Sequence, residues 1–343
     1  MKVCVIGPDY PDAFATCINE ALIDMGHESI IVDPSLALLI HNLAPQLRAF
    51  YFFKILALEK LMIKAFPRLE ERAFKRILPA ISKHKPELVI NISNSLPPQI
   101  IEMARSYAKK VVFWFPDSLG NMGRQYFIAS NYDAVFLKDE KSVEILKDMI
   151  GKKVVYLPEC CLPKWHKKVD ISNNEQERYG CDICIEGTLY WYRAQILECL
   201  SEHDIKIWGP PPPVWMKSPV KRFYTKKYIG GIEKSKAFKA SKIILNTFHP
   251  AESNGPNVRM FEIAGCGGFQ ICEYRPSISK FFELDKEIVV FKTLTELKEK
   301  VRYYLDHPNE RKEISQRAYE KAQKLHTYQI RLQELLKILK DQS

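Results

Sequence analysis

The sequence predicts an α/β protein built from two doubly wound, parallel-sheet domains. Short runs rich in β-branched and aromatic residues alternate with helical patterns along the whole chain, which is typical of parallel sheets with crossover helices. The chain has 343 residues, 46% of them apolar, which is enough for two domains with sizeable cores. A polar stretch broken by proline, at 159–180, lies between the two series of strands and predicts a linker.

The individual strands follow from apolar runs bounded by turn residues. In the first half they are expected at KVCVIG (2–7), ESIIVD (28–33), ELVINIS (87–93), KVVFWFP (110–116), YDAVFLK (132–138) and KVVYLP (153–158). In the second half they are expected at CDICIEG (181–187), DIKIWG (204–209), KIILNTF (242–248), GFQICE (268–273) and EIVVFK (287–292). A helix over 14–25, closed by Gly26, separates the first two strands, and helices are expected from Leu294 onward.

Composition argues against several classes of protein. No apolar run reaches the ~20 residues of a spanning helix, and the opening MKVCVIGPDYPD lacks the apolar run and cleavage site of a signal peptide. Nine cysteines without such a signal predict reduced thiols and a cytoplasmic protein. Cys181 and Cys184 have metal-knuckle spacing, but no second pair follows, and strand residues three apart point to opposite faces. We therefore expect no metal site.

Positive charge is concentrated in one segment. The formal net charge is +10, and residues 46–85 hold ten Lys or Arg against three Glu around the apolar run LRAFYFFKILALEKLMIKAF. A basic amphipathic helix predicts contact with an anionic membrane surface, and hence a peripheral position at the inner face of the membrane. The alternative is a helix packed on the sheet, with Lys stems covering apolar surface. No signature of a nucleic-acid-binding module is present, so no nucleic acid is expected as a partner.

The segment Ile243–Pro276 has the pattern strand, polar loop, helix, strand, and it indicates a ligand site. A loop that leaves a buried parallel strand and enters a helix is where α/β sheets bind ligands, and a helix N-terminus favours phosphate. Arg259 adds a permanent charge there, and Glu262, one turn further, can accept two hydrogen bonds from a ribose diol. The alternative is that Glu262 complements the helix dipole and Arg259 is solvated.

Several motifs of the second half resemble those of one enzyme family. They are Asn257-Val258-Arg259-x-x-Glu262, Gly265-Cys266-Gly267, Glu273-Tyr274-x-Pro276, Glu186-Gly187-Thr188-Leu189-Tyr190 with Arg193, Trp208-Gly209-Pro210, and His326-Thr327-Tyr328-x-x-Arg331. Over residues 180–340 the chain resembles the CgeB-like (spore maturation protein) family of GT-B glycosyltransferases.

The resemblance implies the GT-B fold, in which two Rossmann-like domains face a central cleft. The domain at 1–165 is then expected on the acceptor side, and the domain at 180–325 is expected to bind a nucleotide sugar. A last helix at 326–343 is expected to cross back to the first domain.

The resemblance also implies donor roles for loop residues. Asn254 and Asn257 are expected to bind the donor together with Arg259 and Glu262. The sequence departs from the pattern of retaining GT-B enzymes, in which two glutamates are separated by seven residues. Asn254 occupies the first of these positions, and the nearest acid is Glu252, so the role of that acid does not transfer directly.

Glycosyl transfer needs a stabilised diphosphate leaving group. A metal usually stabilises it through an Asp-x-Asp run, and this chain has none, so we expect metal-independent chemistry in which backbone N–H groups and arginines take that role. Gly187 and Thr188, with Arg193 shortly after them, form a second candidate phosphate cradle. The chain has no GxGxxG and no GxxxxGK[ST] motif, which argues against a dinucleotide oxidoreductase or a P-loop ATPase.

The catalytic base is expected at the carboxyl end of a strand in the first domain. Asp117 and Asp9 both qualify, and the apolar neighbours of Asp117 predict partial burial and a raised pKa. For both, the alternative is a turn-forming or helix-capping role. His249, just after the strand IILNTF, is a candidate to contact the transferred sugar or a phosphate, or else a structural histidine.

We therefore predict a metal-independent GT-B glycosyltransferase with no cofactor beyond its nucleotide-sugar donor, which is expected to be UDP-linked. The acceptor is expected to be a cell-envelope glycan, a lipid-linked molecule or a protein. The alternatives are a sugar-nucleotide epimerase or hydrolase on the same scaffold, and a non-catalytic nucleotide-sugar binding protein.

Overall fold

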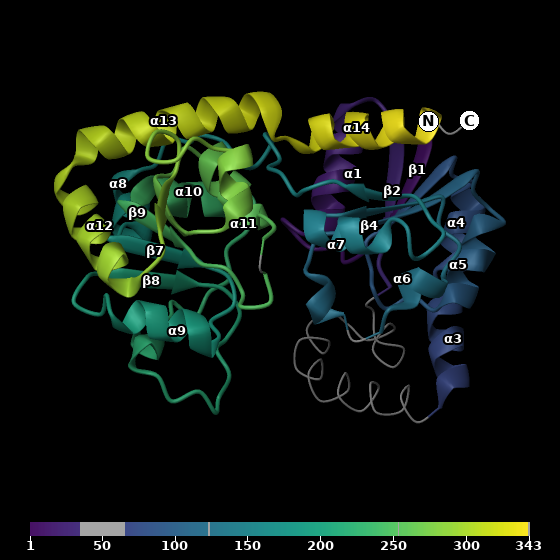
Figure 1. The fold of residues 1–343 in the computed structure, drawn as a ribbon, viewed down its shortest axis with the longest axis horizontal. Coiled ribbons are helices and arrows are strands. Elements are labelled where there is room, and N and C mark those ends of the chain that lie inside the picture. The colour runs from purple at the N-terminus through teal and green to yellow at the C-terminus, as the bar shows by residue number, and fades with distance from the viewer. Residues whose placement is uncertain (35–65, 123, 253, 342–343) are drawn as a thin grey trace. The chain divides into compact units, whose positions relative to one another are not determined.

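The computed structural model describes residues 1–34, 66–122, 124–252 and 254–341, which fold into two units (Figure 1). One unit comprises Met1–Leu137 and Ser142–Leu157, and the other comprises Lys138–Lys141 and Pro158–Ser343. Within the described residues, no helix combines the length and hydrophobicity needed to cross a membrane.

The first unit is built on a six-stranded parallel sheet with the order β2-β1-β3-β4-β5-β6. Its strands are β1 (Lys2–Ile6), β2 (Glu28–Val32), β3 (Leu88–Asn91), β4 (Lys110–Phe115), β5 (Ala134–Leu137) and β6 (Val154–Tyr156). Its helices are α1 (Phe14–Asp24), α3 (Pro67–Lys75), α4 (Leu78–His84), α5 (Pro98–Arg105), η1 (Leu119–Asn121) and α6 (Tyr126–Ala129), and α7 (Glu140–Leu146) follows β5. Residues of α4, α5 and α6 share one core with the sheet.

The second unit has a five-stranded parallel sheet with the order β11-β10-β9-β7-β8. Its strands are β7 (Ile183–Glu186), β8 (Ile205–Trp208), β9 (Ile243–Asn246), β10 (Gln270–Glu273) and β11 (Val289–Phe291). Its helices are α8 (Asn173–Tyr179), α9 (Trp191–Glu198), η2 (Pro219–Phe223), α10 (Ile232–Ala240), α11 (Val258–Gly265), η3 (Pro276–Lys280), α12 (Leu294–Asp306), α13 (Pro308–Leu325) and α14 (Tyr328–Lys340).

Helices cover both faces of this second sheet, and each face has its own core. Ile183, Ile205 and Leu245 pack with residues of α9 and α12 on one face. Cys184 and Ile244 pack with residues of α8, α10 and α11 on the other. Figure 1 shows α9 and α13 on opposite sides of the strands β7, β8 and β9. Two doubly wound parallel sheets are therefore present, and every predicted strand is found.

Two expectations need correction. The stretch 159–180 is not a simple linker, because it contains α8, which Ser172 and Glu175 begin with a capping box. Cys181 and Cys184 do not point to opposite faces. Both side chains pack in the same core, because Cys181 precedes β7 and so does not follow the alternation of a strand. Their thiols are hydrogen-bonded to each other.

The basic segment 46–85 is only partly described. Residues 46–65 lie outside the described residues, so the amphipathic helix expected there is not tested. The following part forms α3 and α4, and the fully buried Ile81 of α4 packs against the sheet. For α4, the packed-helix alternative therefore holds.

Candidate functional site

Three loops meet at the carboxyl edge of the second sheet. β7 lies between β8 and β9, so the loops that leave these strands are neighbours. They contain the turn at Gly187, the turn at Gly209 and the stretch 247–257 that leads into α11. Parallel α/β sheets bind ligands at this edge. α9 and α11 both begin here, and the first N–H groups of a helix have no partner within the helix.

The turns after β7 and β8 require glycine because their backbones lie very close together. Gly187 has φ +108° and Gly209 has φ +153°. A Cβ on Gly209 would lie 2.5 Å from the carbonyl oxygen of Gly187. A Cβ on Gly187 would lie 2.7 Å from Nη2 of Arg259 and 3.2 Å from Nη1 of Arg193. Glycine at 187 thus lets two guanidinium groups approach one backbone turn.

Arg259, in the first turn of α11, is positioned by a carboxylate. Its Nε donates to Oε2 of Glu186, the last residue of β7, over 3.0 Å. The Glu186 side chain is 9% exposed and that of Arg259 is 18% exposed. Burial lowers the pKa of Arg259, but the Glu186 carboxylate outweighs burial and keeps that pKa above its usual value. The guanidinium is therefore charged, oriented and partly open to solvent beside Gly187.

Arg193, in α9, stabilises the same loop from inside. It is buried, and it donates to the carbonyl oxygen of Thr188 over 2.7 Å and to Oγ1 of Thr247 over 2.9 Å. Its guanidinium also lies 4.8 Å from the ring centre of Tyr190. Burial lowers the pKa of Arg193 to about 10, and repulsion from Arg259 contributes to this shift. Arg193 thus ties the exposed Thr188 turn to the end of β9, and its contact with a phosphate stays a prediction.

Glu262 is buried and already has a cationic and an imidazole neighbour. Its Oε2 accepts a hydrogen bond from Nζ of Lys234, in α10, over 2.9 Å. Its Oε1 lies 3.7 Å from Nε2 of the fully buried His166. The Nδ1 of His166 accepts the N–H of Leu162, so Nε2 carries the proton and faces the carboxylate. A ribose at Glu262 would share this carboxylate with Lys234 and His166.

The two asparagines predicted to bind the donor differ in their surroundings. Asn257 caps α11 by accepting the N–H of Met260, and it exchanges two amide hydrogen bonds with Asn246 at 3.1 and 2.9 Å. Asn257 therefore builds the loop and presents the helix N-terminus. Asn254 is buried, and its side-chain amide has no hydrogen-bond partner among the described residues, which leaves the amide available to a ligand.

Glu252, the acid nearest the family's first glutamate position, is a structural residue. Its Oε1 accepts a hydrogen bond from Nζ of Lys138, and its Oε2 accepts a hydrogen bond from the backbone N–H of His249 over 3.2 Å. Arg275 donates to its carbonyl oxygen over 2.7 Å. His249 itself is exposed, its Nδ1 accepts the N–H of Ala251, and its ring centre lies 5.1 Å from that of Tyr190. His249 thus lies beside the loop that follows β7.

The two base candidates lie at the carboxyl edge of the first sheet, where Asp9 follows β1 and Asp117 follows β4. The expected burial of Asp117 is wrong, because its side chain is exposed. Its Oδ1 accepts the N–H of Ser118 and an amide hydrogen of Asn121, so it stabilises the turn into η1. Asp9 is also exposed. The base role of either aspartate stays a prediction.

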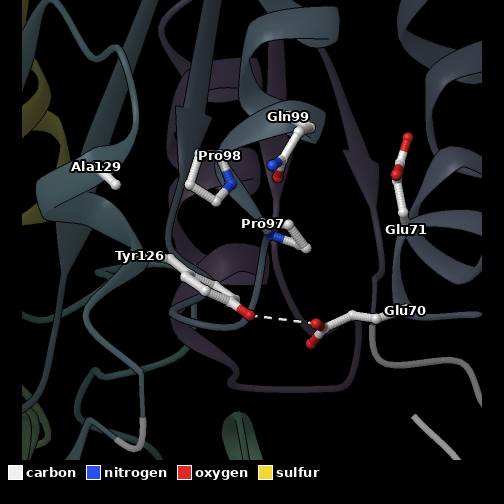
Figure 2. Close-up of a pocket in the computed structure, with 7 residues that line it drawn as sticks. All are labelled: Glu70, Glu71, Pro97, Pro98, Gln99, Tyr126 and Ala129. Atoms are coloured by element: carbon white, nitrogen blue, oxygen red, sulfur yellow. Dashed lines mark hydrogen bonds between the residues drawn. The ribbon is translucent and has the colours of Figure 1, made fainter. Parts of the chain in front are cut away.

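A cavity of about 430 Å³ lies near the same edge of the first sheet (Figure 2). It lies where α5 begins after β3 and α6 begins after β4. Its lining residues are Glu70, Glu71, Pro97, Pro98, Gln99, Tyr126 and Ala129. Figure 2 shows the Tyr126 hydroxyl directed at Glu70, to which it donates over 3.2 Å. Arg124 also pairs with Glu70, so the cavity wall offers neutralised carboxylate, amide and phenol groups.

The late motif His326-Thr327-Tyr328-x-x-Arg331 has a structural role. Thr327 caps α14, and Arg331 donates to the carbonyl oxygen of Pro158 and to Nδ1 of His326. The His326 ring is surrounded by Phe261, Phe281 and Phe282. Burial lowers the pKa of His326 to about 4, and the positive charge of Arg331 contributes to this shift.

Sequence reasoning missed three side-chain pairings with α11. Glu186 was part of a quoted motif, but its contact with Arg259 was not expected, and Lys234 and His166 were not singled out at all. The three residues come from separate segments and meet α11 only in the folded structure. The lining of the cavity was missed as well. Its only sequence signal was Pro97-Pro98 after a strand, since proline favours the first turn of a helix.

Comparison with known proteins agrees with the fold. Residues 193–337 match a family model described as glycosyl transferase-like. No curated protein sequence matches the chain.

Solved structures similar to the whole chain share little sequence with it. Sucrose-phosphate synthase from Thermosynechococcus elongatus has a TM-score of 0.66 at 12% identity, over 100% of both chains. A glycosyltransferase from Rickettsia africae has a TM-score of 0.63 at 12% identity, over 99% of this chain and 98% of its own. HepE from Anabaena, in complex with UDP-glucose, has a TM-score of 0.63 at 11% identity, over 99% of this chain and 100% of its own. The matched family model and the shared fold together support the predicted glycosyltransferase of the GT-B type.

Proposed function

We propose that the chain transfers a sugar from a UDP-linked donor to a hydroxyl group of an envelope glycan, a lipid-linked molecule or a protein, and that it belongs to the CgeB-like subtype. The observation that carries the proposal is the convergence of Arg259, Arg193 and the α11 N-terminus on the turn at Gly187. This turn lies at the sheet edge where ligands bind. The UDP-glucose bound by HepE, a protein of the same fold, motivates the choice of UDP.

In this proposal the diphosphate lies against the Gly187 turn and the N-terminus of α11. Arg259 offers its Nη groups to the leaving phosphate, where charge increases as the glycosidic bond breaks. Because Arg259 is already oriented by Glu186, little reorganisation is needed at that moment. Glu262 contacts the ribose, and Asn254, whose amide is available, contacts the sugar ring. The arginines take the role of a metal ion.

The acceptor is proposed to bind in the cavity of the first unit. Its wall of amide, phenol and carboxylate groups suits the hydroxyl groups of a sugar or a polar headgroup better than an apolar molecule. Asp117 or Asp9 would deprotonate the acceptor hydroxyl. The proposed contact of the segment 46–85 with an anionic membrane would bring the protein close to envelope acceptors.

A donor screen with and without cell-envelope extract tests the proposal. Release of UDP that requires the extract, together with sugar incorporation into an extract component, is the expected result. Release without any acceptor would indicate a hydrolase or an epimerase. Binding of UDP-sugars without release under either condition would indicate a binding protein, and no binding of any nucleotide would refute the donor site.

A further inference from the structure

The segment between β8 and η2 presents large apolar side chains to solvent. Val214 is 95% exposed and Trp215 is 67% exposed, and Trp191, the first residue of α9, is 43% exposed. The two indole rings are 6.4 Å apart. These three residues and the exposed Lys217 form what we call the Trp191–Trp215 surface. Gathered apolar side chains on a protein surface usually mark a place of interaction.

The backbone under this surface is firmly anchored. Met216 and Val220, on either side of Lys217, are buried in the core of the second unit. Lys221 donates to the carbonyl oxygens of Pro213 and Met216, over 3.4 and 3.1 Å, and so fixes the turn between them. Trp215 is therefore directed outward by a fixed backbone, and its exposure is a property of the folded unit.

The segment that carries Val214 and Trp215 is basic. Residues 209–228 contain five Lys or Arg and no Asp or Glu. Lys227 is paired with Glu233, and Lys221 is used by the turn. Lys217, two positions from Trp215, has no partner among the described residues. The nearest acid on α9 is Glu198, which accepts a hydrogen bond from Ser218. A free cation thus lies beside the apolar tips.

We propose that the Trp191–Trp215 surface docks on an anionic lipid bilayer. Tryptophan is favoured at a bilayer interface because its large ring is apolar while its N–H remains hydrated. Lysine next to the bilayer gains attraction from anionic headgroups. Val214 favours a bilayer over a sugar chain as the occupant, because an exposed aliphatic tip offers no hydrogen bond to a saccharide hydroxyl, whereas it fits the acyl boundary.

The position of this surface links it to the candidate donor site. Trp191 opens α9 directly after the loop at Gly187, at the carboxyl edge of the sheet. A bilayer docked here would lie beside the donor loops and would favour an acceptor embedded in that bilayer. This consequence rests on the proposed function, whereas the docking itself does not.

Sedimentation with lipid vesicles tests the proposal on the full chain. Vesicles of phosphatidylcholine alone are compared with vesicles that also contain phosphatidylglycerol, at low and high salt. We expect binding to the anionic vesicles, weakened by salt. The double substitution Val214→Ser with Trp215→Ser should lower the partition coefficient by about tenfold or more, and Lys217→Gln by about fivefold.

Matched measurements separate docking from other causes. Met149→Ser removes an apolar side chain of similar exposure, 78%, from the first unit and should leave partitioning unchanged. Circular dichroism and the urea unfolding midpoint should be unchanged in Val214→Ser with Trp215→Ser, which shows that the second unit is still folded whether or not UDP binds. Equal partitioning of this variant and the wild type would overturn the proposal and move any membrane contact to another segment, such as 46–85. Quenching of tryptophan fluorescence by UDP or maltohexaose, without binding to vesicles, would overturn it in favour of a nucleotide or sugar site.

Discussion

Removing Arg259 separates its structural contribution from its proposed contact with phosphate. In Arg259→Gln, the largely buried carboxylate of Glu186 loses the donor that lies 3.0 Å away. Breaking one partner of a buried ion pair costs about 3–5 kcal/mol of the free energy of unfolding when nothing else compensates the remaining charge. Arg193 lies close enough to Glu186 to offset part of that cost here. Part of this cost is reduced here, since the Arg259 side chain is 18% exposed and water can enter.

The double variant Arg259→Gln with Glu186→Gln removes both charges while nearly keeping the volume of Glu186. It should recover most of the lost stability, because two neutral partners leave no orphaned charge. It should not recover UDP binding, because the loss of charge-assisted hydrogen bonds to phosphate weakens binding by about 1.5–3 kcal/mol, which is roughly 10–150-fold in Kd. Urea unfolding and calorimetry with UDP measure the two effects. A double variant that binds UDP as tightly as the wild type would show that Arg259 has only a structural role.

Four further predictions concern the same machinery. Gly187→Ala should weaken UDP binding at least tenfold while the unit stays folded, because a Cβ at residue 187 would displace Arg259. The substitution also strains the backbone at φ +108°, which costs about 1–3 kcal/mol of the free energy of unfolding. A UDP affinity equal to that of the wild type, measured by calorimetry, would contradict this prediction. Asp117→Asn should lower turnover by about 10²–10⁴ with the donor Kd unchanged, and normal turnover would move the base role to Asp9. Transfer should continue in EDTA, and strict dependence on Mg²⁺ or Mn²⁺ would show that the arginines are not sufficient. The pKa of His326 is about 4 in the folded protein, below its ordinary value of 6.5, so burying neutral His326 contributes stability above pH 6.5 that is lost as the pH falls toward 4. Between pH 7 and pH 5 the free energy of unfolding of the wild type, measured in urea, should therefore fall by ~2 kcal/mol more than that of His326→Asn. Equal losses in the two proteins would refute this prediction.

The fold was readable from the sequence because parallel strands buried on both faces leave continuous apolar runs. VCVI, LVIN and VFWF stand out between polar turns for this reason, and α11 was expected from the pattern strand, polar loop, helix, strand over Ile243–Pro276. The capping box at Ser172 was also present in the sequence, but the proline and polar residues around it obscured a short helix.

Only part of the candidate site could be predicted from the sequence. Residues on one loop and one helix turn, such as Arg259 and Glu262, were predictable because their spacing places them together. Their partners Glu186, Lys234 and His166 were not, since each comes from another element and no local pattern encodes a long-range ion pair. The burial of Asp117 was mispredicted for a different reason: apolar neighbours in the sequence do not determine which way a turn faces.

A crystal structure of the protein with UDP tests the central claim most directly. The account predicts the diphosphate within hydrogen-bonding distance of the Arg259 guanidinium and of the first N–H groups of α11, with the ribose at Glu262. A nucleotide bound away from the turn at Gly187, or one that leaves the Arg259 Nη groups without contact, would contradict it.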